Sequence, residues 1–174
     1  DFVSRSLQIN KPVFISIGGI YPEEISQFIE KHKLKQNPNV TLMYGFQSEP
    51  TLTKENNLLR IKELANLTGL EIGFMDHADA SKEDKVNISI LALAMGITYF
   101  EKHITLDRAL ELEDYISGLT PEEFKNYVLT INGLYGALGS KSLKLTKKEI
   151  QYRNKAICSI TAKSKIEKGI RIKK

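Results

Sequence analysis

Short apolar runs recur along the chain and are separated by about 30 residues. They occupy residues 11–17, 40–46, 71–75 and 97–103. Their branched and aromatic side chains, and their short length between glycines and polar clusters, are typical of β-strands. The pattern therefore predicts four strands in succession.

Segments with the apolar spacing of helices follow these runs. The first of these segments begins near Pro22, and the other three extend over residues 56–67, 86–95 and 120–138. The first and last segments begin with proline and glutamate, which favour the first turn of a helix. A glycine, which commonly ends a helix, follows each of the last three segments. This alternation predicts an α/β fold with a parallel sheet. Four strand–helix units form either a small open sheet or half of an eight-unit barrel.

The C-terminal segment differs from the rest in charge. Residues 141–174 hold 12 Lys/Arg and 2 Glu, a net of +10, whereas residues 1–140 hold 13 Lys/Arg and 19 Asp/Glu, a net of −6. We expect one domain over residues 1–140 and a basic linker over residues 141–174, with a candidate strand at residues 157–162. A basic segment can bind nucleic acid or anionic lipid, but this one has a single aromatic residue, so we favour a solvated linker without such partners.

Composition narrows the class of protein further. No apolar run approaches the roughly 20 residues of a membrane span. No secretory signal is visible, although the chain starts at Asp1. The one cysteine, Cys158, excludes an internal disulfide and suits a reducing compartment, so we expect a cytoplasmic protein. Cys158 has no histidine nearby in sequence, and we expect it in the core.

Two histidines follow successive predicted strands. His77 and His103 are 26 residues apart, with a predicted helix between them. Alternate strand residues face opposite sides of a sheet, so Met75 and His77 share one face, as do Glu101 and His103. Both histidines should therefore point inward at the carboxyl ends of neighbouring strands, where parallel α/β folds bind ligands.

The pattern leaves the chemistry of this pair open. Two imidazoles could hold a divalent metal, with water and substrate completing its coordination, or could act as acid–base groups. Each could instead be a half-buried histidine bonded to a backbone carbonyl. Ser16, which is followed by Gly18 and Gly19 and a helix start, could bind a phosphate or belong to a plain turn.

Several motifs resemble the sialic acid (N-acetylneuraminate) synthase family. The most specific is EKHITLDR at residues 101–108, supported by GFMDH at 73–77, LTPEEF at 119–124 and KPVFIS at 11–16. Residues 154–169 resemble the linker into that family's small antifreeze-like domain. The resemblance covers roughly residues 11–170 and implies the second half of a (β/α)8 TIM barrel.

The resemblance also implies a reaction and its residues. The family condenses phosphoenolpyruvate with an N-acetylated amino sugar to give a nonulosonic acid, and phosphate is released. Manganese or magnesium would be held by His77 and His103 and would polarise the sugar aldehyde. Ser16 matches a phosphate-contacting serine, Gln47 occupies a substrate-binding position, and Asp114 matches an acidic catalytic residue near the sugar. Open sheet edges would be covered by the missing half or by self-association, and a homodimer is expected.

The chain also departs from the family's pattern. Met75 replaces a serine, residues 44–46 read Tyr-Gly-Phe in place of His-Cys-Thr, and residues 112–115 read Leu-Glu-Asp-Tyr in place of Gly-Pro-Asp-His. These changes remove polar contacts around the expected phosphate and sugar. The alternative function is a non-catalytic relative that binds a sugar or another protein.

Overall fold

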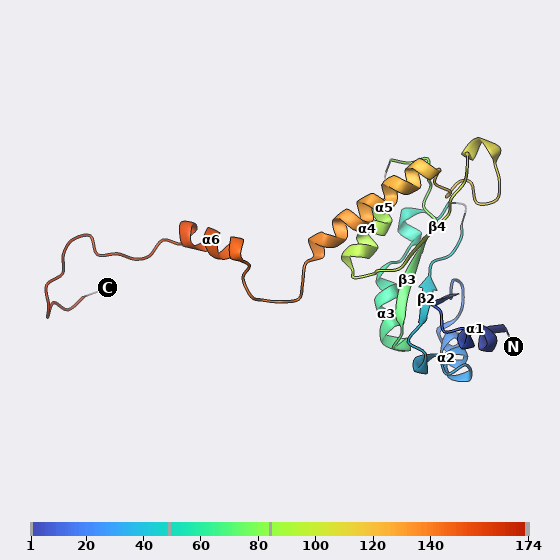
Figure 1. The fold of residues 1–174 in the computed structure, drawn as a ribbon, viewed down its shortest axis with the longest axis horizontal. Helices are drawn as coiled ribbons and strands as arrows, with labels where there is room; N and C mark the ends of the chain where they lie inside the picture. The colour runs from blue at the N-terminus through green and yellow to red at the C-terminus, as the bar shows by residue number, and fades with distance from the viewer. Residues whose placement is uncertain (1, 49, 84, 173–174) are drawn as a thin grey trace. The chain divides into compact units, whose positions relative to one another are not determined.

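The structure is a computed structural model that describes residues 2–48, 50–83 and 85–172 (Figure 1). The chain divides into two compact units, Asp1–Gly139 and Ser140–Lys174, which are described separately below. This division lies one residue before the boundary expected from the change in charge.

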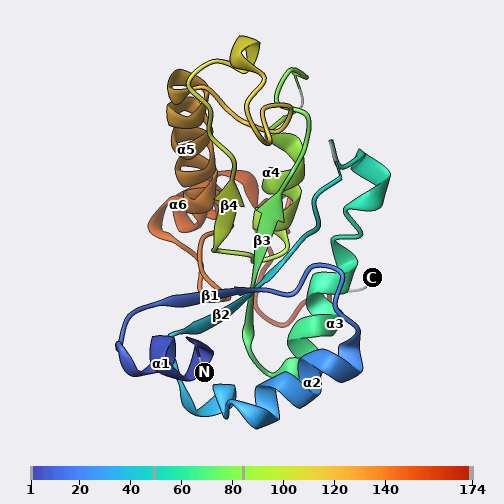
Figure 2. The same cartoon turned by 90° about the vertical axis from the view of Figure 1, so that its right-hand side faces the viewer.

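The first unit is built on a parallel sheet of four strands in the order β1-β2-β3-β4. Its strands are β1 (Val13–Ser16), β2 (Val40–Tyr44), β3 (Glu71–Asp76) and β4 (Phe100–Lys102). The four predicted strands and the α/β class are confirmed. β1 runs across the view of Figure 2 whereas β3 and β4 run upward, so the sheet twists strongly. The strands predicted at 11–17, 40–46 and 97–103 are shorter in the structure than expected.

Helices follow the strands as the periodicity predicts. Thr120 caps α5 in a capping box with Glu123, and Gly69 ends α3 with a φ of 67°. The helices of this unit are α1 (Phe2–Gln8), α2 (Pro22–Lys31), α3 (Leu59–Thr68), α4 (Asn87–Ala94) and α5 (Pro121–Tyr135), with short 3₁₀ helices at Leu34–Gln36, Thr53–Glu55, Arg108–Leu110 and Gly136–Leu138. α1 lies in a segment for which the sequence predicted no element.

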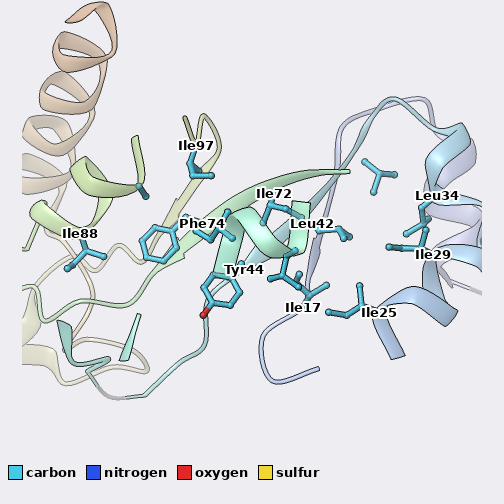
Figure 3. Packing of buried hydrophobic residues seen from close by; sticks show 14 of the residues in the cluster. Ile17, Ile25, Ile29, Leu34, Leu42, Tyr44, Ile72, Phe74, Ile88 and Ile97 are labelled. Carbon is cyan, nitrogen blue, oxygen red and sulfur yellow. The ribbon is translucent and has the colours of Figure 1, made fainter. Parts of the chain in front are cut away.

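The main hydrophobic core lies between one face of the sheet and α2, α3 and α4. Phe74 of β3 and Leu42 of β2 are fully buried in it, and Ile25, Ile72 and Ile88 pack around them (Figure 3). The predicted helix-facing side of β3 is thus confirmed. A smaller cluster joins α4 to α5; its buried members are Ala80, Leu93, Leu119, Tyr127 and Ile131.

The opposite face of the sheet is concave. The rings of Phe14 on β1 and Tyr99 next to β4 lie 5.5 Å apart between their centroids, although two strands separate them in the sheet. Side chains from the first and last strands can meet only if the sheet curls around them. The sheet therefore forms a half-barrel, as the four-unit pattern allowed, with Phe14 51% exposed and Tyr99 40% exposed on its inner face.

The second unit contains one helix, α6 (Lys147–Ala156), among its described residues. Residues 157–162 form no strand, all six being described, so the strand expected there is wrong. A strand needs a ladder partner, and the described part of this unit offers none. Cys158 is exposed rather than in the core, and the described residues around it in this unit are exposed as well.

No helix in the described part of the chain is both long and apolar enough to cross a membrane.

Candidate functional site

A cavity of about 460 Å³ opens at the carboxyl ends of all four strands. The sequence prediction for the inward faces is confirmed. Met75 in β3 and Glu101 in β4 line the cavity, as do His77 and His103 just after these strands. Ser16, at the end of β1, reaches the same cavity. Parallel strands bring these residues together because their carboxyl ends lie at one rim.

The two histidines face each other across the end of β3 and β4. The parallel ladder pairs Met75 with Glu101, and beyond it the imidazole centroids of His77 and His103 lie 4.9 Å apart. Within the described residues, Nδ1 of His77 and Nε2 of His103 are buried side-chain atoms without a hydrogen-bond partner. Buried nitrogens of this kind usually have a partner, so these two atoms are candidate ligand-binding positions.

Burial lowers the pKa of the His77 imidazole from its ordinary value of 6.5, and the neighbouring His103 lowers it further. Glu101 and a backbone hydrogen bond with Met75 act in the opposite direction. The lowered pKa favours the neutral ring near pH 7. Neutral imidazole is the form that donates a lone pair to a metal.

His103 is held from its other side by Asp114. The Nδ1–Oδ2 distance between them is 3.3 Å, and Gln47 donates a hydrogen bond to the other oxygen, Oδ1. Asp114 occupies a left-handed backbone conformation with a φ of 62°, in the loop that follows β4. A carboxylate at Nδ1 fixes the tautomer and leaves Nε2 to face a ligand, as in many metal-binding histidines.

The donor set suits a divalent metal that keeps open positions. Two imidazole nitrogens are ligands for manganese, zinc or iron, and the carboxylate behind His103 is the usual supporting group. No cluster of three or more His, Cys, Asp or Glu side chains with metal-binding geometry occurs in the described residues. The expectation that a metal here would take its remaining ligands from water and substrate stays a prediction.

The structure brings all five predicted site residues to one end of the half-barrel. Ser16, Gln47, His77 and His103 line the cavity, and Asp114 contacts two of them. Gly18 and Gly19 also line the cavity beside Ser16, where their backbone could approach an anion. Met75 presents a thioether where a hydroxyl was expected, so this part of the wall is less polar.

Part of the cavity lining is made by closely packed backbone at Gly18, Gly45 and Met75. A Cβ on Gly45 would collide with the carbonyl oxygen of Met75, and one on Gly18 would collide with that of Gly45. Gly45 also has a φ of 148°, which side chains disfavour. The glycine that departs from the family's pattern is thus required by the close approach of β2 and β3 here.

A buried ion pair behind the histidines is the main feature that sequence reasoning missed. Nζ of Lys102 lies 3.0 Å from Oδ1 of Asp76, and both side chains are almost inaccessible to water. Burial lowers the pKa of Lys102 from 10.5, while Asp76 opposes that shift. The signal was available: these residues share the strand face of Phe74 and Phe100, so the alternation already placed two opposite charges on the covered side.

The sequence matches the model of a known protein family over residues 1–143, and the model is described as the NeuB family. Among curated proteins, the chain is 29% identical over 171 residues to N,N'-diacetyllegionaminic acid synthase of Campylobacter jejuni and 30% identical over 169 residues to pseudaminic acid synthase of the same organism. It is 28% identical over 169 residues to N-acetylneuraminate-9-phosphate synthase of Homo sapiens. Each alignment covers 97% of this chain.

These alignments cover 49%, 48% and 45% of the relatives, so the chain spans about half the length of the curated relatives it matches. The crystal structure of N-acetylneuraminic acid synthetase from Leptospira borgpetersenii, in complex with citrate, superposes with a TM-score of 0.73 at 27% identity. That superposition covers 89% of this chain and 53% of the other. The spore coat polysaccharide biosynthesis protein spsE of Bacillus subtilis, at a TM-score of 0.67 and 23% identity, shares the fold.

The half-barrel, the inward histidine pair and the relatives' names agree with the resemblance read from the motifs. Since the family model covers well over half of its residues, the chain belongs to the NeuB family, in which the relatives named above are synthases of sialic, legionaminic or pseudaminic acids.

Proposed function

We propose that the protein carrying this chain is a metal-assisted synthase that condenses phosphoenolpyruvate with an N-acetylated amino sugar to give a nonulosonic acid. The observation that carries the proposal is the pair of buried, unpartnered nitrogens on His77 and His103, two residues that line one cavity. Membership of a family whose named relatives are nonulosonic acid synthases supports the same reaction class.

His77 and His103 would hold a divalent cation, manganese or magnesium. When bound, the metal supplies Lewis-acid polarisation of the sugar aldehyde. The two rings would hold that cation at one position beside the cavity and would thereby orient the aldehyde toward the enol carbon of phosphoenolpyruvate.

The other predicted residues have distinct roles in this proposal. Ser16 and the backbone beside it would contact the phosphate of phosphoenolpyruvate. Gln47 lines the cavity and also donates to Asp114, so it would contact the sugar from a fixed position. Both carboxylate oxygens of Asp114 already have protein partners, and we therefore propose that Asp114 acts on catalysis by orienting His103.

The proposal applies to the whole protein, because the chain spans about half the length of its relatives. Further phosphate and sugar contacts would come from four additional strand–helix units that complete the barrel. We propose that this protein works in the cytoplasm as a homodimer, and that residues 141–174 lead into an antifreeze-like domain.

A second candidate is a non-catalytic relative that binds a sugar or another protein. The observation that favours it is the loss of polar groups from the cavity lining, where Met75 and Gly45 replace residues with hydroxyl and thiol groups. Such a protein would retain the cavity but would not catalyse the condensation. Detectable condensation with any amino sugar would exclude this candidate.

The test is phosphate release from phosphoenolpyruvate by the intact protein, with manganese titrated in and several N-acetylated amino sugars offered. His77→Ala and His103→Ala should each reduce the rate by at least a hundredfold, since each removes half of the protein's metal ligands. The matched control is His32→Ala, because His32 lies at the end of α2 and packs on Phe28, away from the cavity. Full activity in either cavity variant would refute the proposal.

A further inference from the structure

A buried ion pair joins the last paired residues of β3 and β4. Asp76 and Lys102 are partners in the parallel ladder, and their side chains are 0% and 1% exposed. Each residue immediately precedes one of the two histidines. Neighbouring strand residues face opposite sides, so the ion pair lies on the helix-covered side while His77 and His103 face the cavity.

The ion pair also holds the chain beyond His77. Oδ1 of Asp76 accepts a hydrogen bond from the backbone N–H of Ala78 at 2.9 Å. Nζ of Lys102 donates to the backbone carbonyl of Ala78 at 3.3 Å. The residues on both sides of His77 are thus fixed by the same two side chains, and the His77 backbone can move only if these contacts break.

Two hydroxyl groups extend this arrangement into the helices beside β3 and β4 (Figure 2). Ser89 of α4 donates to Oδ2 of Asp76 at 2.5 Å, and Tyr127 of α5 donates to Oγ of Ser89 at 2.9 Å. Ser89 and Tyr127 are both buried. The carboxylate of Asp76 is therefore placed by four elements, β3, β4, α4 and α5, rather than by its strand alone.

A contribution to the free energy of unfolding does not explain why this ion pair is present. Removing two charges from water costs about as much as their attraction returns, and apolar pairs of similar size are often as stable. The ion pair does provide a fixed geometry at the strand ends. We propose that Asp76 and Lys102 are positioning residues that hold the imidazoles of His77 and His103 at the separation at which both can bind one divalent cation.

This proposal rests on the metal site of the proposed function, but ring placement can be measured without metal. The test compares the intact wild-type protein with the double variant Asp76→Asn/Lys102→Met. Both charges are removed together, so neither is left buried and unpaired, and the asparagine retains an acceptor for the N–H of Ala78.

We expect the double variant to bind Mn²⁺ at least tenfold more weakly by isothermal titration calorimetry. In the metal-free protein, the nuclear Overhauser contact between the rings of His77 and His103 should be lost. The unfolding midpoint should stay within a few degrees of wild type. A lower midpoint with unchanged Mn²⁺ affinity and an unchanged ring contact would overturn the proposal.

The matched control is Thr98→Val. It removes the 3.0 Å hydrogen bond from Thr98 to Glu71 at the other end of the same two strands, and should leave the Mn²⁺ affinity and the ring contact unchanged. If the double variant does not fold, Ser89→Ala tests the proposal instead, because it removes the hydrogen bond from Ser89 to Asp76 without removing a charge. An unchanged ring contact and affinity in Ser89→Ala would then overturn the proposal.

The two proposals fail in different ways. If the wild-type protein binds neither Mn²⁺ nor Mg²⁺, the metal-assisted function is wrong, and the ring contact between His77 and His103 alone tests the positioning role. Its loss in Asp76→Asn/Lys102→Met supports that role, and its retention refutes it.

Discussion

At the scale of single residues, the site depends on how closely backbone and side chains approach. Gly45 allows the ends of β2 and β3 to pack with no room for a Cβ. Asp114, 11 residues beyond His103, returns to hold the ring of that histidine. Neither residue is a proposed metal ligand, so substitution at each should change one measurable property of the protein.

Gly45→Ala should destabilise the protein by about 1–3 kcal/mol, because the new Cβ meets the carbonyl of Met75 at an unfavourable φ. The matched control is Gly133→Ala in α5, where a Cβ would have no neighbour within 4 Å. That change should stabilise the helix by up to about 1 kcal/mol. Urea denaturation of both variants measures the effects, and equal shifts for the two would contradict this account.

Asp114→Ala should weaken Mn²⁺ binding by about tenfold, because the carboxylate no longer fixes the tautomer and orientation of His103. Calorimetric titration of the intact protein measures the affinity. Glu113→Ala is the control, since Glu113 is the preceding residue of the same loop and is exposed. The orienting role would be wrong if the two variants bound Mn²⁺ equally well.

At the scale of elements, the start of α5 is fastened to the loop that follows β4. Glu123 completes the capping box with Thr120 and also pairs with Arg108 and with Lys85, the latter at 2.6 Å. Arg108 in turn donates to the carbonyl of Gly118. The carboxylate of Glu123 thus stabilises the N-terminus of α5 and, through Arg108, connects both ends of the loop that carries Asp114.

Glu123→Gln should therefore lower the free energy of unfolding by about 1–2 kcal/mol at pH 7. Hydrogen bonds from Arg108, opposed by burial and assisted by Lys85, hold the pKa of Glu123 well below its ordinary 4.5. A carboxyl whose pKa is depressed by folding stabilises the protein above its unfolded pKa, and this contribution is lost as pH falls toward the folded pKa.

The difference between wild type and Glu123→Gln should accordingly be constant from pH 7 to about pH 5 and shrink below about pH 4.5. Urea unfolding at a series of pH values measures it. Glu122→Gln serves as the control, because this neighbouring residue is exposed. A difference that grew as the pH fell would contradict the assignment.

At the scale of the whole molecule, the half-barrel presents a concave face with aromatic side chains. Phe14 and Tyr99 remain 51% and 40% exposed there, although their rings contact each other. β1 and β4 each have one edge without a strand partner in the described sheet. Exposed aromatic groups beside open strand edges favour association with another chain or segment.

Expressed by itself, the 174-residue chain should self-associate at micromolar concentration through this face. Analytical ultracentrifugation measures the association, and Phe14→Ser/Tyr99→Ser should weaken it by removing the aromatic surface. Leu143→Ser is the control, because Leu143 is 99% exposed and lies in the other unit. A monomer at all concentrations would show that the concave face is stable when uncovered.

The sequence alone predicted the features that depend on neighbours along the chain. Alternating apolar runs and helical segments predicted the four units, and the helix start at residue 120 and the glycine after α3 were predicted correctly from local chemistry. The inward direction of His77 and His103 followed from strand alternation. The candidate strand at residues 157–162 was wrong, because an apolar run cannot indicate by itself whether a partner strand lies beside it.

Tertiary structure decided the contacts between residues that are far apart in sequence. Asp76 meets Lys102 across 26 positions, and Gln47 meets Asp114 across 67. Such contacts depend on the curl of the sheet and the packing of the helices, which no local period encodes. The sequence therefore determined which side chains face the cavity, and only the assembled half-barrel determined which groups hold them in place.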